Sequence, residues 1–368
     1  MALTGLEIYK HLPKENCKEC GLPTCLAFAM KVASGQAGLD DCPRLSDEAR
    51  AQLSQASAPP QRLVKIGADP HPIVVGQETV MFRHDDKFHH ATAVALTISD
   101  AGDDDVIRKS CETFGKLQFM RVGETLKADM IALVNDSGSP DRMMTAAEII
   151  YNELGVPMVL IAQSVDSLSA VATGPLSGTR PVLCPKGDLK AEELAELAKQ
   201  AGAPVVVHGE LQAVADKVEA LDAAGVKDVL ISAGCAPLRE TLSFMTRARR
   251  AALNKKFRPL GCPALAVALG DDAVAASLDA CACVAKYAAL VVTNAWEPQL
   301  LLPILTARQN IYTDPQKPVQ VEPKVYEIGD VTADSPVLVT TNFSLSYYSV
   351  ESEVEASRVP SYIVAVDT

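Results

Sequence analysis

From about residue 63 onward, the chain alternates short runs of apolar, β-branched residues with longer amphipathic stretches. In the longer stretches, apolar residues recur at spacings of three and four, which predicts helices that pack one face on a core. The short runs predict eight strands, at residues 94–99, 130–134, 157–162, 181–184, 204–208, 228–232, 261–267 and 289–293. Their starts recur every ~23 to 36 residues, the repeat of a (β/α)8 TIM barrel. We therefore predict an α/β protein whose central barrel domain spans residues 63–312, with a hairpin-like segment at residues 73–83 at its base.

A second pattern follows a proline-rich linker at residues 313–323. It predicts a strand at residues 336–340, a helix at 345–357 and a second strand at 362–366, the first β-α-β unit of an open parallel sheet. Both strands are nearly continuous apolar runs, which is typical of parallel strands covered on both faces. Because roughly 45 residues are too few for a doubly wound domain, we expect residues 325–368 to be a partial C-terminal domain that is poorly ordered by itself.

The first 57 residues follow neither pattern and form a third predicted domain. They hold four of the ten cysteines, Cys17, Cys20, Cys25 and Cys42. A helix is expected directly after Cys25 and another at residues 46–55. The small and proline residues at 56–61 predict a linker, because such a segment cannot pack a core.

The spacing of these four cysteines indicates a metal centre. Cys17, Cys20 and Cys25 share one short loop that can wrap one face of a 4Fe-4S cluster, and Cys42, followed by proline, can close the other face. Gly21 is expected to bring the backbone close to the cluster, and the apolar residues after Cys25 to shield it from water. The alternative is a four-cysteine zinc site, which usually pairs two closely spaced knuckles. There is no second knuckle near Cys42, so the sequence favours the cluster.

Charge and composition exclude some classes of function. The chain has 34 Lys and Arg against 46 Asp and Glu, a net charge of −12, which argues against nucleic-acid binding. It begins without a signal-peptide pattern and has no run of 18 apolar residues, so we expect a cytoplasmic protein with no membrane contact. The other six cysteines are expected to be buried small apolar side chains. No catalytic residue is assigned, because no histidine is placed beside a carboxylate or thiol.

Four segments in order resemble the large (gamma) subunit of the corrinoid iron-sulfur protein of the reductive acetyl-CoA (Wood-Ljungdahl) pathway. They are residues 15–25 with Cys42-Pro43, residues 76–84, residues 311–318 and residues 340–348. The resemblance covers essentially the whole chain. It implies a heterodimer with a small barrel subunit, and a corrinoid whose cobalt lies against the C-terminal domain.

The resemblance also implies a function. The corrinoid cobalt would carry a methyl group from a methyltetrahydrofolate methyltransferase to acetyl-CoA synthase, and the 4Fe-4S cluster would reduce Co(II) back to Co(I). In an open parallel sheet, ligands bind after the carboxyl end of a strand, which makes the turn Thr340, Thr341, Asn342, Phe343 and Ser344 the candidate corrinoid contact. The alternative interpretation of this turn is a loop that caps the helix after it. The alternative function is an electron-transfer or interaction subunit without corrinoid.

Overall fold

The computed structural model describes residues 5–33, 37–46, 49, 53, 59–70, 72–314 and 319–368. By its internal contacts the chain divides into two compact units, Met1–Pro59 and Pro60–Thr368. Each is described by itself below. The finer division into domains 1–57, 63–312 and 325–368 stays a prediction.

The N-terminal unit is built on two short helices, α1 (Gly5–His11) and α2 (Cys25–Ala33), with a 3-10 turn, η1 (Leu39–Asp41). The helix expected after Cys25 is therefore present and starts at that cysteine. Ile8, Phe28 and Leu53 are almost fully buried in the core of this unit. Gly5 lies so close to α2 that a Cβ atom there would be 2.4 Å from the sulfur of Met30. Most of the helix predicted at residues 46–55 lies outside the described residues.

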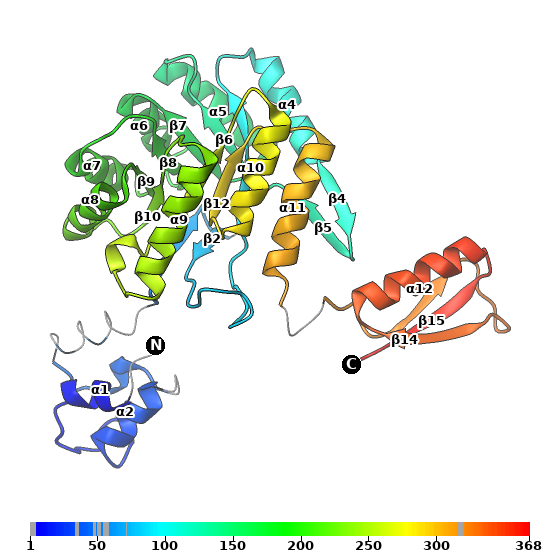
Figure 1. Ribbon diagram of the computed structural model, residues 1–368, viewed down its shortest axis with the longest axis horizontal. Helices are drawn as coiled ribbons and strands as arrows, with labels where there is room; N and C mark the ends of the chain where they lie inside the picture. The colour runs from blue at the N-terminus through cyan, green and yellow to red at the C-terminus, as the bar shows by residue number, and fades with distance from the viewer. Residues whose placement is uncertain are drawn as a thin grey trace. The chain divides into compact units, whose positions relative to one another are not determined.

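All eight predicted barrel strands are present, and they form one parallel sheet in the order β10-β9-β8-β7-β6-β3-β12-β11. A bridge between Ile231 and Ala264, with a 3.0 Å hydrogen bond from the Ile231 N–H to the carbonyl oxygen of Pro263, joins the two ends of this order. The sheet is thus a nearly closed parallel barrel of the TIM type that the sequence predicts (Figure 1). Its strands are β3 (Ala93–Ser99), β6 (Met130–Val134), β7 (Met158–Ala162), β8 (Val182–Pro185), β9 (Val205–His208), β10 (Val229–Ser232), β11 (Leu265–Ala268) and β12 (Leu290–Thr293).

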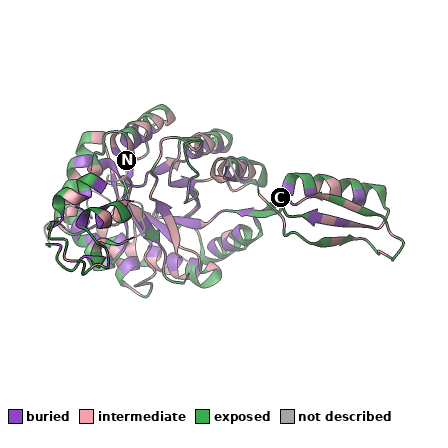
Figure 2. Cartoon of the chain, turned by 90° about the horizontal axis from the view of Figure 1, so that it is seen from below, coloured by how far each residue is buried: buried purple, intermediate pink, exposed green. Residues whose placement is uncertain are grey.

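Helices follow the barrel strands in sequence and form the outer layer. Strand side chains alternate between two cores. Val292 and Leu230, for example, point into the barrel, whereas Val291 and Ile231 pack against the helices. Figure 2 shows the buried residues on the strands and on the inner faces of the helices. The helices are α4 (Asp104–Lys116), α5 (Pro140–Leu154), α6 (Val165–Thr173), α7 (Ala191–Ala201), α8 (Leu211–Ala223), α9 (Leu238–Leu253), α10 (Ala273–Ala285) and α11 (Pro298–Tyr312). None of the described helices is long and apolar enough to cross a membrane.

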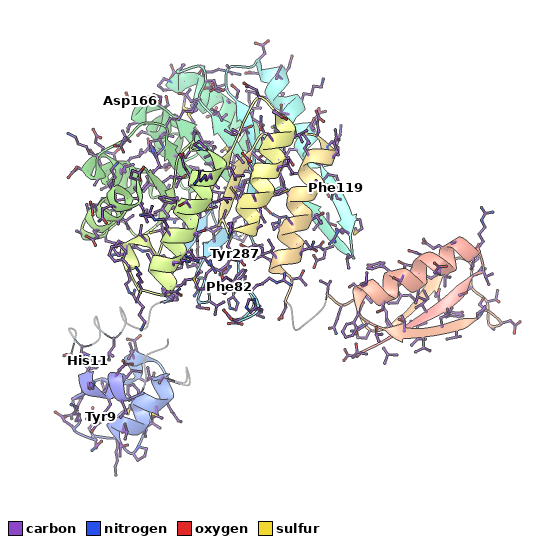
Figure 3. All side chains as sticks on the ribbon, in the orientation of Figure 1. Tyr9, His11, Phe82, Phe119, Asp166 and Tyr287 are labelled. Carbon is purple, nitrogen blue, oxygen red and sulfur yellow. The ribbon has the colours of Figure 1, made fainter. Side chains whose placement is uncertain are left out.

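The base of the barrel is covered by an antiparallel hairpin of β1 (Leu63–Ile66) and β2 (Ile73–Gly76). The prediction of a hairpin at residues 73–83 was wrong in its extent, because β2 pairs with the preceding segment and ends at Gly76. Val64, Ile66 and Val75 are at most 1% exposed and pack on the barrel interior. Figure 3 places Phe82 and Tyr287 at this same end of the barrel.

Two further local features differ from expectation. Strand β11 starts at Leu265 rather than at residue 261, because the 3-10 turn η2 (Arg258–Leu260) precedes it and Gly261 lies against the incoming chain. A Cβ atom on Gly261 would be 2.2 Å from the carbonyl oxygen of Pro60, so only glycine allows this approach. A hairpin of β4 (Gln118–Arg121) and β5 (Glu124–Lys127), not foreseen from the sequence, lies between α4 and β6.

The C-terminal segment contains the predicted β-α-β unit, as β14 (Val337–Thr341), α12 (Ser344–Ser357) and β15 (Ser361–Val366), with β14 and β15 parallel. A third strand, β13 (Val325–Ile328), pairs antiparallel with β15 and was not predicted. Helix α12 covers one face of this sheet. The described chain leaves this sheet partly uncovered, since Val325, Val337 and Val339 are 55–70% exposed. That the segment starts a doubly wound corrinoid-binding domain stays a prediction.

Candidate cofactor sites

The four N-terminal cysteines line one small cavity, which brings together residues up to 25 positions apart. Cys17 and Cys20 lie on the loop between α1 and α2, Cys25 is the first residue of α2, and Cys42 directly follows η1. Cys17 and Cys20 are partly exposed, whereas Cys25 and Cys42 are buried. None of the four forms a disulfide, so each can supply a thiolate ligand. The other residues that line the cavity are Leu12, Pro13, Asn16, Lys18, Leu22, Thr24 and Phe28.

The cavity has a volume of about 10 Å³, which is room for roughly one water molecule. In the described parts of the chain, no three His, Cys, Asp or Glu side chains are grouped so that they could hold a metal ion. The thiols nevertheless influence one another: burial raises the pKa of Cys42, and charge on Cys20, Cys17 and Cys25 raises it further. The four side chains therefore line one cavity, and their role as cluster ligands stays a prediction.

Asn16 and Thr24 position Cys25, and the sequence analysis missed both. The side-chain oxygen of Asn16 accepts a 2.8 Å hydrogen bond from the backbone N–H of Cys25. Thr24 caps α2, because its hydroxyl oxygen accepts a hydrogen bond from the N–H of Ala27 at 3.1 Å. Cys25 thus lies at the N-terminus of α2, where the partial positive charge of the helix favours a bound anion. The signal for the cap was a threonine immediately before an apolar helical run.

Gly21 closes a turn within the cysteine loop. Its φ of +74° is in the left-handed region that favours glycine. Its N–H donates to the carbonyl oxygen of Lys18 at 2.9 Å, so the glycine closes a turn between Cys17 and Cys25. No protein atom outside its chain neighbours lies within 4 Å of the position that a Cβ would take. Gly21 is therefore required for the backbone turn, and its close approach to the cluster stays a prediction.

Arg44 links the cysteine loop to the segment that carries Cys42. Its guanidinium donates to Glu15 at 2.9 Å and to Glu19 at 2.6 Å. Hydrogen bonding to Arg44 lowers the pKa of Glu19. This carboxylate therefore stays ionised at pH values at which an ordinary glutamate becomes protonated. The arginine is also only two residues after Cys42 in the sequence.

The apolar shield predicted after Cys25 is only partly present. Phe28 and Ala29 are buried, but Leu26 is 41% exposed and Met30 is 57% exposed. These two side chains lie on the outer face of α2, because a helix presents only one stripe to its core. Leu12, from the end of α1, lies beside the cavity instead.

Of the six other cysteines, Cys111, Cys184, Cys262 and Cys283 are buried as predicted. Burial raises the pKa of Cys111 to about 11 and those of the other three to about 12, which keeps these thiols protonated and unreactive. The prediction of burial was wrong for Cys235, which is exposed on the loop after β10, and for Cys281, which is partly exposed.

The candidate corrinoid turn runs from Thr340 and Thr341, the last two residues of β14, to Ser344, the first residue of α12. The hydroxyl oxygens of Thr341 and Ser344 are buried and have no hydrogen-bond partner in the described parts of the chain. Such groups carry an energetic cost unless a ligand pairs with them. Asn342, in contrast, is engaged: it accepts from the Thr368 hydroxyl at 2.8 Å and donates to Asp367 at 3.4 Å.

The remaining two residues of this turn, Thr340 and Phe343, are partly exposed. The segment before β13 packs along the turn: the N–H of Val321 donates to the carbonyl oxygen of Asn342, and the N–H of Ser344 to that of Val319, each at 2.8 Å. The turn therefore offers two unpaired hydroxyl groups to a ligand, and one of its edges is already hydrogen-bonded to the chain.

Comparison with known proteins places these sites in a family. Residues 63–368 match the family model of the CO dehydrogenase/acetyl-CoA synthase delta subunit, and residues 12–44, which hold the four cysteines, match a model of an Fe-S cluster segment. Among solved structures, the 7,8-dihydropteroate synthase from Vibrio fischeri ES114 is similar, at 12% identity and a TM-score of 0.46 over 61% of this chain and 95% of that one.

Two curated proteins are similar over this entire chain. The corrinoid/iron-sulfur protein large subunit of Moorella thermoacetica is 42% identical, with 82% of its length covered. The acetyl-CoA decarbonylase/synthase complex subunit gamma of Methanothermobacter thermautotrophicus is 34% identical, with 83% covered. Both alignments include the cysteine segment, which lies outside the delta-subunit model. The chain therefore belongs to the family of corrinoid/iron-sulfur protein large subunits and acetyl-CoA decarbonylase/synthase gamma subunits.

Proposed function

We propose that this chain is the iron-sulfur and corrinoid-binding subunit of a methyl carrier in the acetyl-CoA pathway. Membership of the family supports this function, and so does the convergence of Cys17, Cys20, Cys25 and Cys42 on one cavity, which is the single observation that carries it. When bound, the corrinoid carries the methyl group on cobalt, and the 4Fe-4S cluster supplies the electron that returns Co(II) to Co(I).

The chain's own residues provide two environments for these groups. The four thiols would ligate iron, Asn16 holds Cys25 in place, and Arg44 ties Glu15 and Glu19 to the segment of Cys42. A positive charge near a cluster and a helix N-terminus at Cys25 both favour the reduced cluster, whereas burial of Cys42 disfavours added negative charge. The balance among these effects sets the reduction potential of the cluster.

At the other end of the chain, Thr341 and Ser344 would donate hydrogen bonds to amide or phosphate oxygens of the corrinoid. Their unpaired buried hydroxyls support this assignment. The proposed partners are a small barrel subunit that forms a heterodimer with this chain, a methyltetrahydrofolate methyltransferase as methyl donor and acetyl-CoA synthase as acceptor. The names of relatives as subunits of a complex support an assembly of this kind.

The test is metal analysis of the full chain, co-expressed with the small subunit and purified without oxygen. We expect about four irons per chain, and a broad visible absorbance that bleaches on reduction. Cys20→Ser should lose this iron. Cys235→Ser is the matched control, because that thiol lies on the exposed loop after β10, and it should retain all of it. One zinc per chain without iron would refute the cluster.

Cobalt decides between the two functions considered. Stoichiometric cobalt in the wild-type heterodimer supports the methyl carrier, whereas iron without cobalt supports an electron-transfer subunit. In the Cys20→Ser variant, methyl transfer should still proceed once cobalt has been reduced chemically, but activity should not recover after oxidation. Failure of transfer even from Co(I) would mean that the cluster has a role in the transfer itself.

A further inference from the structure

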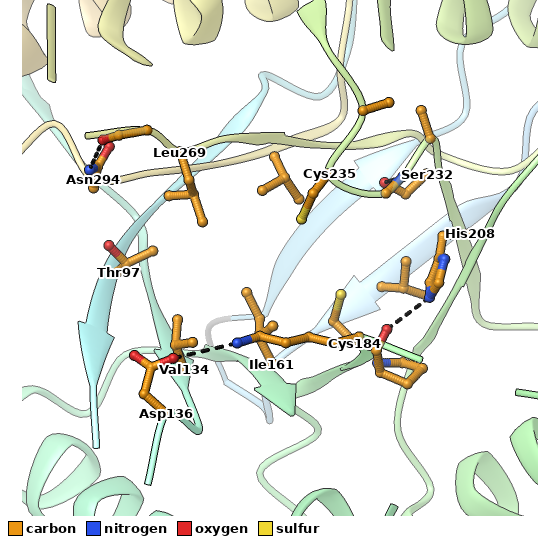
Figure 4. Close-up of a pocket in the computed structure, with 18 of the residues that line it drawn as sticks. Thr97, Val134, Asp136, Ile161, Cys184, His208, Ser232, Cys235, Leu269 and Asn294 are labelled. Atoms are coloured by element: carbon orange, nitrogen blue, oxygen red, sulfur yellow. Dashed lines mark hydrogen bonds and ion pairs between the residues drawn. The ribbon is translucent and has the colours of Figure 1, made fainter. Parts of the chain in front are cut away.

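The two ends of the barrel are built differently. At the carboxyl ends of its strands lies a cavity of about 780 Å³, whose lining includes Asp136 and Asn294 (Figure 4). The opposite end is closed by the β1-β2 hairpin and by residues 77–92, which join β2 to β3 without a helix or strand. We call residues 77–92 the basal strap. Because most connections in compact domains have about four to six residues, the length of this strap indicates a role beyond joining two strands.

The start of the basal strap holds the segment that enters the barrel. The N–H of Gln77 donates to the carbonyl oxygen of Arg62 at 3.0 Å. The N–H of Glu78 donates to Oε1 of Gln61 at 3.1 Å. A change that loosens the start of the strap therefore also loosens residues 61 and 62.

Arg249 of α9 clamps the middle of the strap. Its guanidinium donates to the carbonyl oxygen of Val80 at 2.6 Å, and it lies 5.3 Å and 4.8 Å from the ring centroids of Phe88 and Tyr287. Phe88 is 5% exposed and meets Tyr287 edge to face. Phe82, between Val80 and Phe88, is instead 48% exposed. Arg249 therefore anchors the buried part of the strap, whereas the centre of the strap reaches solvent.

Glu78 is the anionic partner of this arginine, but the pair is poorly matched. The two side chains are 9% and 8% exposed, and 3.9 Å separates carboxylate from guanidinium, which is too far for a hydrogen bond. Nε of Arg249 has no hydrogen-bond partner among the residues that the structure describes. A buried ion pair compensates for lost hydration only when good geometry and hydrogen bonds complete it. The site therefore favours the protonated form of Glu78.

The neighbouring groups leave Glu78 as the group that titrates near neutral pH. Burial raises the pKa of Glu78 to about 7, although Arg249 opposes the rise and Asp86 of the strap adds to it. Tyr312 of α11 also interacts with this carboxylate, but burial raises the pKa of Tyr312 to about 12, so it stays neutral. The proton on Glu78 therefore decides whether the pair with Arg249 is charged on both sides.

We propose that the basal strap is a clamp operated by one proton. With a proton on Glu78, the strap stays closed on Arg249. When that proton is lost to solvent, the strap opens, the carboxylate becomes hydrated, and residues 61 and 62 are released. This inference does not depend on the cluster or on the corrinoid.

The direction of the pH effect follows from linkage. Glu78 binds its proton more tightly in the closed strap than in an open one, so the closed state loses stability as the pH rises from about 5 to 8. His90, near the end of the strap, acts in the opposite sense. Burial lowers its pKa, so protonation of His90 at acid pH favours opening.

The test is hydrogen exchange of the full chain, purified with its partner subunit and followed by mass spectrometry at pH 6 and pH 8. Each rate is divided by the rate in Glu78→Gln at the same pH. This ratio removes the intrinsic pH dependence of exchange and the effect of His90, and glutamine supplies a permanently neutral side chain. For peptides within residues 77–92, the ratio should rise several-fold, up to roughly tenfold, between the two pH values. These peptides should also exchange faster than those of β3, because local opening requires less free energy than unfolding of the barrel.

Asp86→Asn gives a second test that leaves Glu78 and Arg249 in place. Loss of this neighbouring carboxylate lowers the pKa of Glu78, so opening should reach its high-pH level at a lower pH than in wild type. Asp85→Asn is the matched control, because Asp85 is also exposed on the strap but does not influence Glu78, and it should follow wild type. The proposal is overturned if the ratio for the strap is equal at pH 6 and pH 8, if the strap exchanges no faster than β3, or if the two aspartate variants behave alike.

Discussion

The side-chain oxygen of Asn16 accepts a hydrogen bond from the backbone N–H of Cys25, nine residues further along the chain. This bond spans the loop that contains Cys17 and Cys20, so it fixes the start of α2 relative to the start of the cysteine loop. Asn16 itself has a φ of +50°, in the left-handed region that asparagine tolerates better than most residues. Asn16 thus both adopts the left-handed backbone conformation of the turn and accepts the hydrogen bond from Cys25.

Replacing Asn16 by glycine should make the cluster easier to lose. Glycine keeps the left-handed backbone but removes the acceptor, so the N–H of Cys25 loses its partner at a cost of about 1 kcal/mol. We expect iron to be released several-fold faster than from wild type on exposure to a chelator. Lys14→Gly is the control, because Lys14 also has a positive φ, +62°, but does not line the cavity. Equal rates of release from the two variants would argue against a role for the Asn16 side chain.

At the base of the barrel, Glu78 is buried beside Arg249, with 3.9 Å between carboxylate and guanidinium. Arg249 also lies over the rings of Phe88 and Tyr287 and donates to the carbonyl oxygen of Val80. Burial raises the pKa of Glu78 to about 7, since the loss of hydration outweighs the attraction of the arginine. The carboxyl group is therefore protonated more readily in the folded chain than in the unfolded one.

This raised pKa predicts how stability depends on pH. A group with a raised pKa in the folded state contributes its full stability below its unfolded pKa, about 4.3, and this contribution is lost as the pH rises through 7. The free energy of unfolding of the barrel in urea should therefore fall between pH 5 and pH 8. Glu78→Gln should flatten this fall, whereas Glu153→Gln, in the exposed pair with Arg108, should not. A wild-type stability that rises with pH in this window would contradict the assignment.

Gly76, at the end of β2, should tolerate no side chain. Its φ is +89°, and a Cβ there would be 2.1 Å from the carbonyl oxygen of Arg62 and 2.7 Å from the ring of Pro263. Gly76→Ala should lower the free energy of unfolding by at least about 2 kcal/mol. Gly115→Ala, near the end of α4 with no atom within 4 Å, should instead raise it by roughly 0.5–1 kcal/mol. Denaturant midpoints of the two variants give the comparison directly.

Ser344→Ala separates the cost of an unpaired hydroxyl from its use in binding. Removal of a buried donor that lacks a partner should leave the stability of the chain unchanged or raise it by up to about 1 kcal/mol. If that hydroxyl contacts the corrinoid, the same variant should retain less cobalt. Ser349→Ala, whose hydroxyl donates to the carbonyl oxygen of Leu345 on the exposed side of α12, should change neither quantity by much. Retention of cobalt equal to wild type would remove Ser344 from the proposed site.

The barrel was predictable because its strands are short apolar runs at a regular interval. Such runs are typical of parallel strands that are buried on both faces. The β4-β5 hairpin was missed because its turn consists of Val122 and Gly123, with φ of +50° and +77°. A β-branched residue such as Val122 rarely adopts a positive φ, so its presence does not indicate a turn. The third C-terminal strand, β13, was missed because it follows prolines and reads as the end of a linker.

The cysteine set could be read from spacing alone, whereas the residues that position it could not. Asn16 and Arg44 act through contacts with residues 9 to 29 positions away, and no local pattern marks such pairs. Likewise, no local pattern singles out Asn294 or Asp136, which line one cavity only when the barrel forms. The available signal for this cavity was that charged and amide side chains follow the ends of predicted strands.

The closure of the barrel at Ile231 and Ala264 has a mechanical consequence. This joint is one isolated bridge, whereas the β3-β6 and β6-β7 pairs run over four or five residue pairs. The polypeptide that arrives from the N-terminal unit attaches beside it, through the hydrogen bond from the N–H of Arg62 to the carbonyl oxygen of Gly261 and the contact of Pro60 with that glycine. Tension transmitted along the chain from Pro60 therefore reaches the barrel wall at a seam with little backbone pairing, where amide exchange should report it early.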